Sequence, residues 1–366
     1  MSLSRGLGSI RRGSRTRQSV LPLSQKNATT TSCSLCSVSP LTLKSYATDY
    51  ACEPRFGEIY HAAQRWQTVP QHRRYIHSTK VHLKNTTASP TGEKGADTDS
   101  SSGDIICSVT PAPAGGQGTI ASVTLSNPGR LNSLNSTLIS KLISILRSLA
   151  SQSDLRCVVI QGAVSTTKAP AFTSGANIYE MAKLNNYGDA KAFISRLHEA
   201  CQAMRDLPVV TIAQIHGLCL GGGLELAAAC DSRYATRTSS FSMPETKYGI
   251  PSVIEARLLA NIIGWQKTKE MVYLAKFYDA EEMQRWGLVD MSCEDIQDLE
   301  EKVTEVVKTV TSYGPETMRA QKRLVRVWEE NDLVSGVDAG VDAYASMFKD
   351  GGSEPVEYMK IFTERK

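Results

Sequence analysis

A cluster of three glycines between an apolar strand and a helix constrains this chain more than any other feature of its sequence. Residues 211–231 read TIAQIHGLCLGGGLELAAACD, so Gly221, Gly222 and Gly223 separate a β-branched apolar run from an alanine- and leucine-rich helix. Glycines at such a junction let the backbone approach a ligand closely and adopt conformations that other residues avoid. Amides at the positive end of the following helix are suited to holding negative charge. A tight turn needed only for packing is the alternative interpretation.

The common nucleotide-binding loops do not match this cluster. A Walker A loop requires Gly-Lys-Ser/Thr, and a dinucleotide-binding fingerprint requires Gly-x-Gly-x-x-Gly. The segment Gly221–Glu225 contains neither pattern. Any anion bound here is therefore expected to be held in another way.

A second glycine segment again leads from a strand and loop into a helix. It consists of Ala171, Phe172, Thr173, Ser174, Gly175, Ala176, Asn177 and Ile178. Two separated backbone amides can converge on one oxygen atom, which is how an oxyanion hole is built. Two acids accompany these segments: Glu225 on the helix after the glycine cluster, and Glu245 after a Met-Pro turn. A single acid is usually a solvated surface group, whereas two acids placed in this way suggest general acid–base chemistry.

The pattern along the chain predicts an α/β fold, because strand-like apolar runs alternate with helically spaced ones. Residues 105–109 and 119–125 are predicted to form a hairpin, and 157–160 and 209–215 buried strands. The last of these is predicted to run directly into the glycine cluster. Leucines and isoleucines between 134 and 149 predict a helix over 134–150 with Ser133 as its cap. From Ile296 onward the pattern is helical and increasingly charged.

Composition divides the chain into four parts. The first 48 residues contain no acid and are rich in Ser, Thr and Arg, which is typical of an organelle transit peptide. Because Arg73–Ser78 resembles a matrix-processing site, residues 1–80 are interpreted as a mitochondrial transit peptide, with a basic tail of unknown purpose as the alternative. A flexible linker is predicted over 81–103. A core over 104–295 and a C-terminal helical region over 296–366 then follow, and the protein is expected in the mitochondrial matrix.

Charge and hydropathy argue against two classes of partner. Residues 1–80 hold 12 Lys/Arg and 3 Asp/Glu out of totals of 41 and 37, so the rest of the chain carries a net charge of −5. An acidic body lacks the electrostatic footprint of a nucleic-acid binder. No run approaches the roughly 18 apolar residues that cross a bilayer. The nine cysteines have no paired spacing, and Cys33 and Cys36 have no second pair or histidines beside them, so no metal site is predicted.

Four blocks of the chain together resemble the crotonase (enoyl-CoA hydratase/isomerase) superfamily in their residues, order and spacing. They are Asn127-Pro128 with Leu131–Asn135, then Ala171–Ile178, then His216–Asp231, then Pro244-Glu245 with Gly249–Pro251; Arg285–Asp290 is a weaker fifth block. The resemblance spans roughly residues 104–366. It implies a spiral of ββα turns with a C-terminal helical region, assembled as a homotrimer or a dimer of trimers.

The resemblance also implies roles for single residues. The amides of Ala176 and Gly222 would hold the oxygen of an acyl-CoA thioester, and Glu225 and Glu245 would bind a water between them and move its protons. Arg130 is a candidate for binding the CoA phosphates, with a solvated loop arginine as the alternative. CoA would be part of the substrate, and no separate cofactor is implied. The residues expected to contact substrate or CoA are Arg130, Ala171, Phe172, Gly175, Ile178, Gly221 and Gly223.

Three departures from the family pattern affect these expectations. Asn177 stands where many relatives have Asp. The loop 246–256 is one residue shorter before its proline and lacks the glycines that hydratases commonly have there. That loop carries an additional acid, Glu255, interpreted either as a surface or salt-bridged residue or as a group that contacts a polar acyl group or assists proton transfer. Four further residues carry weaker interpretations: His216 as a hydrogen-bonded core histidine, His198 without a predicted partner, and Lys322 and Arg323 as candidates for phosphate.

The predicted function is that of a mitochondrial enoyl-CoA hydratase-like lyase, because both glutamates are retained. An enoyl-CoA double-bond isomerase needs the same oxyanion hole but can work with one carboxylate. An acyl-CoA thioester hydrolase would direct an activated water to the carbonyl carbon. The alternative from a different class is an inactive binding protein of the same fold, for which the acidic body argues against RNA as the ligand.

Overall fold

The computed structural model describes residues 103–364, and its main sheet has six strands in the order β1-β2-β3-β5-β7-β10. They are β1 (Asp104–Pro111), β2 (Thr119–Ser126), β3 (Leu155–Gly162), β5 (Val210–Ile215), β7 (Ser232–Thr236) and β10 (Met291–Cys293). β1 and β2 pair antiparallel, which confirms the predicted hairpin, and the other neighbours pair parallel. The predicted transit peptide over 1–80 and all but the last residue of the predicted linker lie outside the described residues.

A second sheet of four short strands carries the chain into the glycine cluster. Its order is β4-β6-β8-β9, with β4 (Ala171–Thr173), β6 (Leu218–Leu220), β8 (Ser240–Ser242) and β9 (Tyr278–Asp279). The prediction that the strand over 209–215 runs directly into the cluster is therefore wrong. After Ile215 the chain leaves the main sheet and turns at Gly217, whose φ is +83°. A Cβ at Gly217 would lie 1.9 Å from the carbonyl oxygen of Pro170, so only glycine fits this turn.

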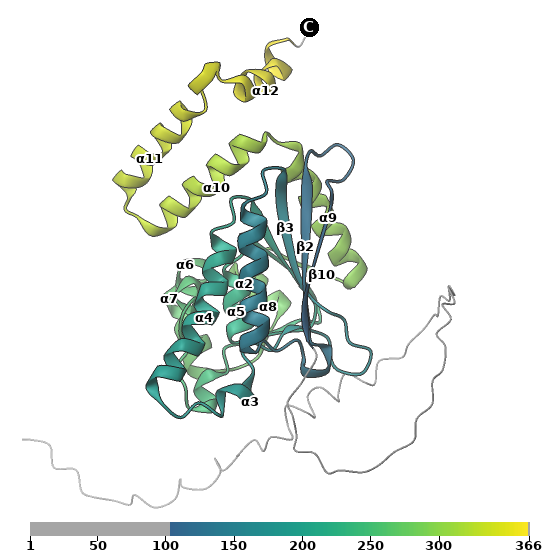
Figure 1. Ribbon diagram of the computed structural model, residues 1–366, viewed down its shortest axis with the longest axis vertical. Coiled ribbons are helices and arrows are strands. Elements are labelled where there is room, and N and C mark those ends of the chain that lie inside the picture. The colour runs from purple at the N-terminus through teal and green to yellow at the C-terminus, as the bar shows by residue number, and fades with distance from the viewer. Residues whose placement is uncertain (1–102, 365–366) are drawn as a thin grey trace, which may run out of the picture. The chain divides into compact units, whose positions relative to one another are not determined.

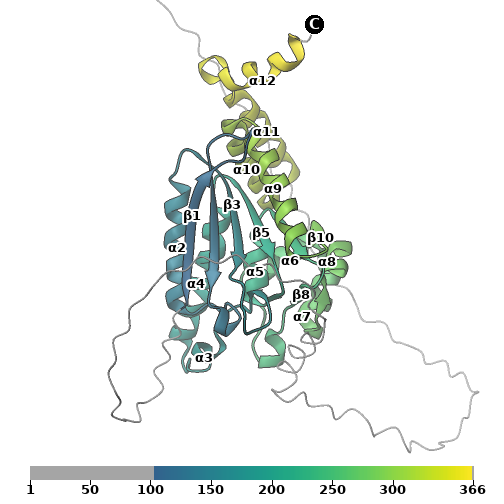
Figure 2. The same ribbon diagram turned by 90° about the vertical axis from the view of Figure 1, so that its right-hand side faces the viewer.

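Helices α2 (Ser136–Ala150) and α4 (Tyr187–Arg205) pack side by side on one face of the main sheet (Figure 1, Figure 2). The helix predicted over 134–150 is confirmed, but its predicted cap at Ser133 is wrong. The Oδ1 atom of Asn135 accepts a hydrogen bond from the Leu138 N–H at 2.9 Å. The helix cannot begin earlier, because the N–H of Leu134 donates to the carbonyl of Gly175 at 2.8 Å and keeps this part of the chain extended.

Helix α9 (Ile296–Ser312) covers the opposite face of the main sheet (Figure 2). Its buried residues Leu299, Val303 and Val307 recur at helical spacing and form a small apolar cluster with strands β3, β5 and β10. The larger apolar cluster lies on the α2 and α4 side. Parallel strands covered on both faces are buried throughout, which explains the continuous apolar runs of β3 and β5 in the sequence.

The other helices surround the second sheet or follow α9, and their bounds complete the architecture. They are α3 (Ile178–Met181), α5 (Gly222–Ala228), α6 (Ala256–Ile262), α7 (Gly264–Leu274), α8 (Ala280–Trp286), α10 (Pro315–Glu330), α11 (Leu333–Ser346) and α12 (Ser353–Thr363), with 3-10 turns η2 (Pro128–Arg130), η3 (Glu245–Tyr248) and η4 (Lys349–Gly351). The predicted α/β class and the helical pattern after Ile296 are confirmed. Over 103–364 no helix combines the length and apolar character needed to span a bilayer.

Candidate active site

The glycine cluster forms a sharp turn between β6 and α5. Gly221 has φ +51° and ψ −126°, a backbone conformation open almost only to glycine. Its N–H donates to the carbonyl of Ser242 in β8 at 2.9 Å, which ties the turn to the second sheet. Gly222 then begins α5, so its amide is at the N-terminus of the helix, where no intrahelical acceptor exists.

The second glycine segment lies directly against this turn. A Cβ added to Gly175 would lie 3.1 Å from the amide nitrogen of Gly222, and one added to Gly222 would lie 3.8 Å from the amide nitrogen of Ala176. Among the described residues, no hydrogen bond is donated by the amides of Ala176 or Gly222. The fold therefore brings together the two predicted amides, and both remain able to donate to a ligand.

Asn177 follows these amides and begins helix α3. Its Oδ1 atom accepts hydrogen bonds from the N–H groups of Tyr179 at 2.9 Å and Glu180 at 3.1 Å. Asn and Asp are both strong N-cap residues because each offers a side-chain oxygen to these donors. The replacement of the more common Asp therefore preserves the capping geometry next to the Ala176 amide.

Glu225 lies within α5 and is 2% exposed. Its Oε1 atom accepts a hydrogen bond from the N–H of Ala256 at 2.9 Å. Burial raises the pKa of Glu225 well above its ordinary value, and the charges of Glu245 and Glu255 raise it further, while the Ala256 hydrogen bond opposes the shift. This carboxyl group therefore favours its neutral form far more than a surface glutamate does.

Glu245 begins the η3 turn and reaches back over the glycine cluster. A Cβ at Gly221 would lie 2.4 Å from the Oε1 atom of Glu245, so the carboxylate occupies the space that any other residue at position 221 would fill. Its Oε2 atom accepts a hydrogen bond from the hydroxyl of Ser252 at 3.3 Å. Burial is the main cause that raises the pKa of Glu245, and the Ser252 hydrogen bond acts in the opposite direction.

Two amides without acceptors, one at buried Gly222 and one at partly buried Ala176, and two carboxyls with raised pKa values thus surround one glycine turn. The sequence pattern that defines the enoyl-CoA hydratase/isomerase family matches residues 115–366. The chain belongs to this family. The crotonase superfamily to which the sequence blocks point, and with it the crotonase-type α/β fold, is confirmed.

Several relatives support this membership. The chain is 33% identical over 218 residues to the mitochondrial methylglutaconyl-CoA hydratase of Homo sapiens, an alignment covering 58% of this chain and 63% of that protein. It is 26% identical over 251 residues to the short-chain-enoyl-CoA hydratase of Clostridium acetobutylicum, covering 68% of this chain and 93% of that protein. The crystal structure of an enoyl-CoA hydratase from Bacillus anthracis superposes with a TM-score of 0.64 at 28% identity, covering 70% of this chain and 96% of that chain.

The altered loop of this crotonase contains a buried acid that contacts a histidine. Glu255 is 4% exposed, and its Oε1 atom lies 2.7 Å from the Nδ1 atom of His198 on α4. Glu255 is therefore a buried acid in contact with a histidine, and its location on the surface is excluded. The sequence offered no signal for the partner, because 57 residues separate the two side chains.

The remaining predicted residues lie at varying distances from the glycine turn. Ala171 and Phe172 are buried in β4, and Ile178 is 37% exposed at the start of α3. The guanidinium carbon of Arg130 lies 4.9 Å from the centre of the Tyr179 ring, so its cation stacks on an aromatic residue of α3. Arg130 and Ile178 thus belong to one partly exposed surface next to the Ala176 amide.

Two of the weaker candidates have other surroundings than the sequence indicated. Lys322 forms an ion pair with Asp231 and its side chain is 10% exposed, so its ammonium group already has an anionic partner. His216 is half-buried, and burial lowers its pKa. Within residues 103–364, no group of three or more His, Cys, Asp or Glu side chains is placed to hold a metal ion.

Proposed function

We propose that this protein is an enoyl-CoA hydratase that adds water to the conjugated double bond of an acyl-CoA thioester. The observation that carries the proposal is the pairing of two acceptor-free amides, of Ala176 and Gly222, with the buried carboxyl of Glu225 and the partly buried carboxyl of Glu245 around one glycine turn. The same turn that exposes the Gly222 amide places Glu225 one helical turn further on and leaves room for Glu245.

The two amides would bind the carbonyl oxygen of the thioester. When a nucleophile adds to the β-carbon, negative charge moves through the conjugated system onto this oxygen. Preorganised amides stabilise that charge as it develops, and they cost no reorganisation at the moment of reaction. The loss of one such donor typically costs about 2.7–4 kcal/mol of barrier.

Glu225 and Glu245 would hold the attacking water and transfer its protons. Burial raises the pKa of both carboxyls above the ordinary value of a glutamate, which makes each a better proton acceptor than a surface glutamate and suits general acid–base catalysis. One carboxylate takes a proton from the water as its oxygen bonds to the β-carbon. A proton then returns to the α-carbon, so the reaction releases no net proton.

The site's surroundings support the further parts of the proposal. Arg130, on the partly exposed surface beside α3, would contact the phosphates of CoA. The acid-free, arginine-rich leader and the mitochondrial relatives support import into the mitochondrial matrix. Helix α11 exposes Leu333, Val337 and Val341, whose burial by neighbouring copies would fit a homotrimer or a dimer of trimers.

The direct test is to mix the full-length protein with trans-2-butenoyl-CoA and with 3-methylglutaconyl-CoA, following loss of the conjugated thioester absorbance. Products are identified by mass spectrometry. A hydratase yields a 3-hydroxyacyl-CoA, an isomerase yields an acyl-CoA of unchanged mass with a shifted double bond, and a thioester hydrolase yields free CoA thiol.

Variants Glu225→Gln and Glu245→Gln accompany the wild type, with Glu199→Gln as the matched control. Glu199 is an exposed acid on α4 that pairs with Arg147. Hydration by the wild type and the control, with loss in both site variants, supports the proposal. Hydration that survives in both site variants, or formation of one of the other two products, refutes it.

A further inference from the structure

Glu255 is a buried acid near Glu225 to which the proposed hydration assigns no role. One oxygen of Glu255 is bonded to His198, whereas the other, Oε2, is buried without a hydrogen bond of normal geometry; the Cys201 thiol is its neighbour in the described structure. A buried polar atom without a partner costs free energy. An arrangement of this kind, next to reacting groups, indicates a function that outweighs the cost.

The chain connects Glu255 directly to Glu225. Glu255 is the N-cap residue of α6, yet its side chain makes no capping hydrogen bond. The next residue, Ala256, donates its N–H to the Oε1 atom of Glu225 at 2.9 Å. The preceding residue, Ile254, has a φ of +47°, which is strained for a β-branched side chain. The amide that holds the Glu225 carboxyl group therefore belongs to the peptide bond that follows Glu255.

Glu225 and Glu255 also interact through their charges. The negative charges of Glu245 and Glu255 both contribute to the raised pKa of Glu225. From α4, Cys201 faces this cluster: burial, and then the charges of Glu255 and Glu225, raise the pKa of its thiol well above the ordinary value. His198, from the same helix, brings a positive charge to Glu255 whenever its imidazole is protonated.

Helix α7, which packs on α6, carries Lys267 and Glu270, which form an ion pair, and Lys269. Strands β4 and β6, which contact α5, contain Cys219 as their only titratable residue. On α6, the guanidinium group of Arg257 bonds to Asn261 and lies over the ring of Trp265. The charges that raise the pKa of Glu225 are those of Glu245 and Glu255, and His198 contacts the second of these acids.

His198 differs from the acids in its access to solvent. Its side chain is 52% exposed, whereas Glu255 is 4% exposed and Glu225 2% exposed. The imidazole can therefore exchange protons with water while the carboxyl groups behind it stay dry. Two residues that are 57 positions apart in the chain thus link a solvent-exposed titratable group to the environment of Glu225.

We propose that His198 and Glu255 form a positioning pair for Glu225, which holds the Ala256 amide in place and sets the charge of the Glu225 carboxyl group. This inference rests on the proposed function of Glu225 in proton transfer. When His198 is protonated, its charge cancels that of Glu255 and ionisation of Glu225 becomes easier. When His198 is neutral, the uncompensated charge of Glu255 opposes that ionisation.

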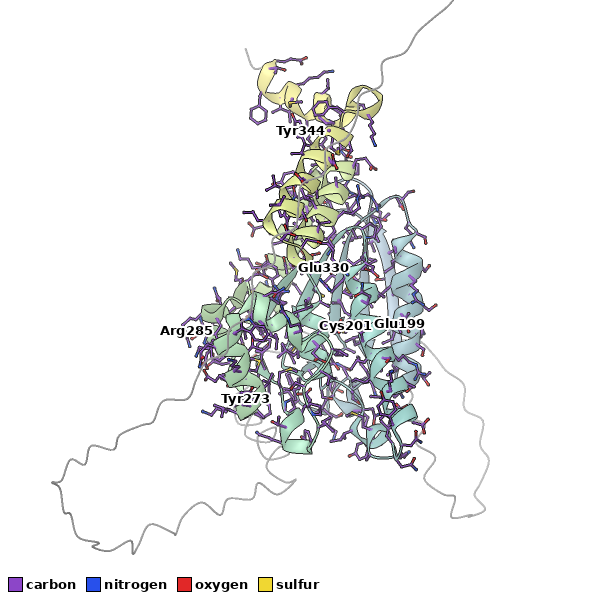
Figure 3. The ribbon with its side chains drawn as sticks, turned by 90° about the vertical axis from the view of Figure 1, so that its left-hand side faces the viewer. Glu199, Cys201, Tyr273, Arg285, Glu330 and Tyr344 are labelled. Carbon is purple, nitrogen blue, oxygen red and sulfur yellow. The ribbon has the colours of Figure 1, made fainter. Side chains whose placement is uncertain are left out.

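The test follows the protonation of Glu225 without any substrate. The carboxylic acid C=O band of protonated Glu225 is recorded by infrared difference spectroscopy across pH in the full-length protein, and is assigned by its loss in Glu225→Gln. The variants are Glu255→Gln, which keeps the size and removes the charge, and His198→Gln, which keeps a donor to Glu255 and removes the cation. Glu199→Gln, from the neighbouring position on α4 (Figure 3), is the matched control.

The two variants are expected to shift the titration in opposite directions. In Glu255→Gln the band disappears at lower pH than in the wild type, because a like charge is lost. In His198→Gln it disappears at higher pH, because the compensating charge is lost, and in Glu199→Gln it is unchanged. Damage to packing cannot produce opposite shifts. If Glu255→Gln does not fold, the half-exposed His198→Gln still decides the matter by its direction.

Unchanged titration in both variants, or a shift in the same direction in both, would overturn the proposal. In steady-state hydration, the pH dependence of kcat should follow the infrared shifts while KM stays the same. If the two variants shift the Glu225 titration in opposite directions but the protein hydrates no enoyl-CoA, the His198–Glu255 positioning pair is supported and the proposed function is refuted. If the protein hydrates enoyl-CoA but the two variants do not shift the Glu225 titration in opposite directions, the proposed function is retained and the His198–Glu255 pair is refuted.

Discussion

The two glutamates of the site lie in opposite kinds of surroundings. Glu225 belongs to α5, whose seven residues are all buried, and the Ala256 amide holds it. Glu245 begins η3, a short turn without a single buried residue, and is held by the longer hydrogen bond from Ser252. One region gives a glutamate a rigid, dry position, and the other gives it a partly solvated position at the edge of a loop.

This difference teaches how one residue type can take two roles in a single site. Burial raises the pKa of both carboxyls, but that of Glu225 is raised further because its neighbours add two negative charges to the desolvation. Two carboxyls whose environments separate their pKa values can act as acid and base at one pH. The contrast between α5 and η3 therefore underlies the proposed chemistry, and four changes test it.

The largest effect is expected from Glu225→Gln. Gln keeps the volume and still accepts the Ala256 hydrogen bond, so the fold should be retained while proton transfer is lost. A general acid–base group typically contributes about 10²–10⁴-fold, and kcat for hydration should fall by that factor. Absorbance assays measure the fall, and circular dichroism checks the fold. A fall of less than about tenfold would place the chemistry outside α5.

The second largest loss of kcat is expected from Gly221→Ala. Gly221 lies where the α5 region meets the Glu245 carboxylate of the η3 region. The new Cβ would meet the Glu245 carboxylate, and the backbone conformation costs a non-glycine residue about 1–3 kcal/mol. Displacement of a catalytic group by about 1 Å can cost about 10²-fold in rate. Gly264→Ala is the control, since its φ is +74° and nothing lies within 4 Å of its Cβ position. Equal loss of kcat in both variants would show that strain alone is responsible.

The stability of the protein should depend on pH through the raised pKa of Glu225. Above the ordinary value of 4.5, the unfolded chain loses a proton that the folded state retains. The free energy of unfolding therefore falls as pH rises from 4.5, until the folded pKa is passed, by about 1.4 kcal/mol per unit of separation.

Glu225→Gln lacks this titration, so its stability gain over the wild type should grow as pH rises above 4.5 and then level off. Glu245→Gln should gain less, because Glu245 is the less desolvated group. Thermal unfolding of the three proteins across pH measures both gains. A larger gain in Glu245→Gln would reverse the comparison of the two regions.

The smallest effect is expected from Ser252→Ala. Because the Ser252 hydroxyl lowers the pKa of Glu245, its removal should move the Glu245 limb of the kcat profile to higher pH. A hydrogen bond of this kind is worth about 0.5–1.5 kcal/mol, so kcat should change by about two- to tenfold. Ser140→Ala on α2, where the hydroxyl bonds to the backbone carbonyl of Ser136, is the control. An unmoved limb would mean that η3 holds Glu245 without the serine.

Local features predicted the fold class and the positions that come together at the glycine turn. Alternating strands and helices predicted the α/β class, and the helix over 134–150 followed from the spacing of its leucines. The glycine cluster was recognisable in the sequence, and at Gly221 the structure shows why glycine is needed: its φ is +51° and a Cβ would meet the Glu245 carboxylate. Strand and helix periodicity and glycine turns can be predicted from a sequence because they depend on residues that are close together in the chain.

Contacts between distant segments were decided by the tertiary structure alone. Strand β6 was missed because three residues carry no periodicity and it pairs with β4 and β8 in a separate sheet. The cap at Asn135 follows from a hydrogen bond between Leu134 and Gly175 that keeps the preceding residues extended. The pairs His198–Glu255 and Lys322–Asp231 join residues 57 and 91 positions apart. A sequence shows which side chains can ionise. Their partners and their pKa values are set by the tertiary structure, because burial and neighbouring charges depend on distances in space and not on positions in the chain.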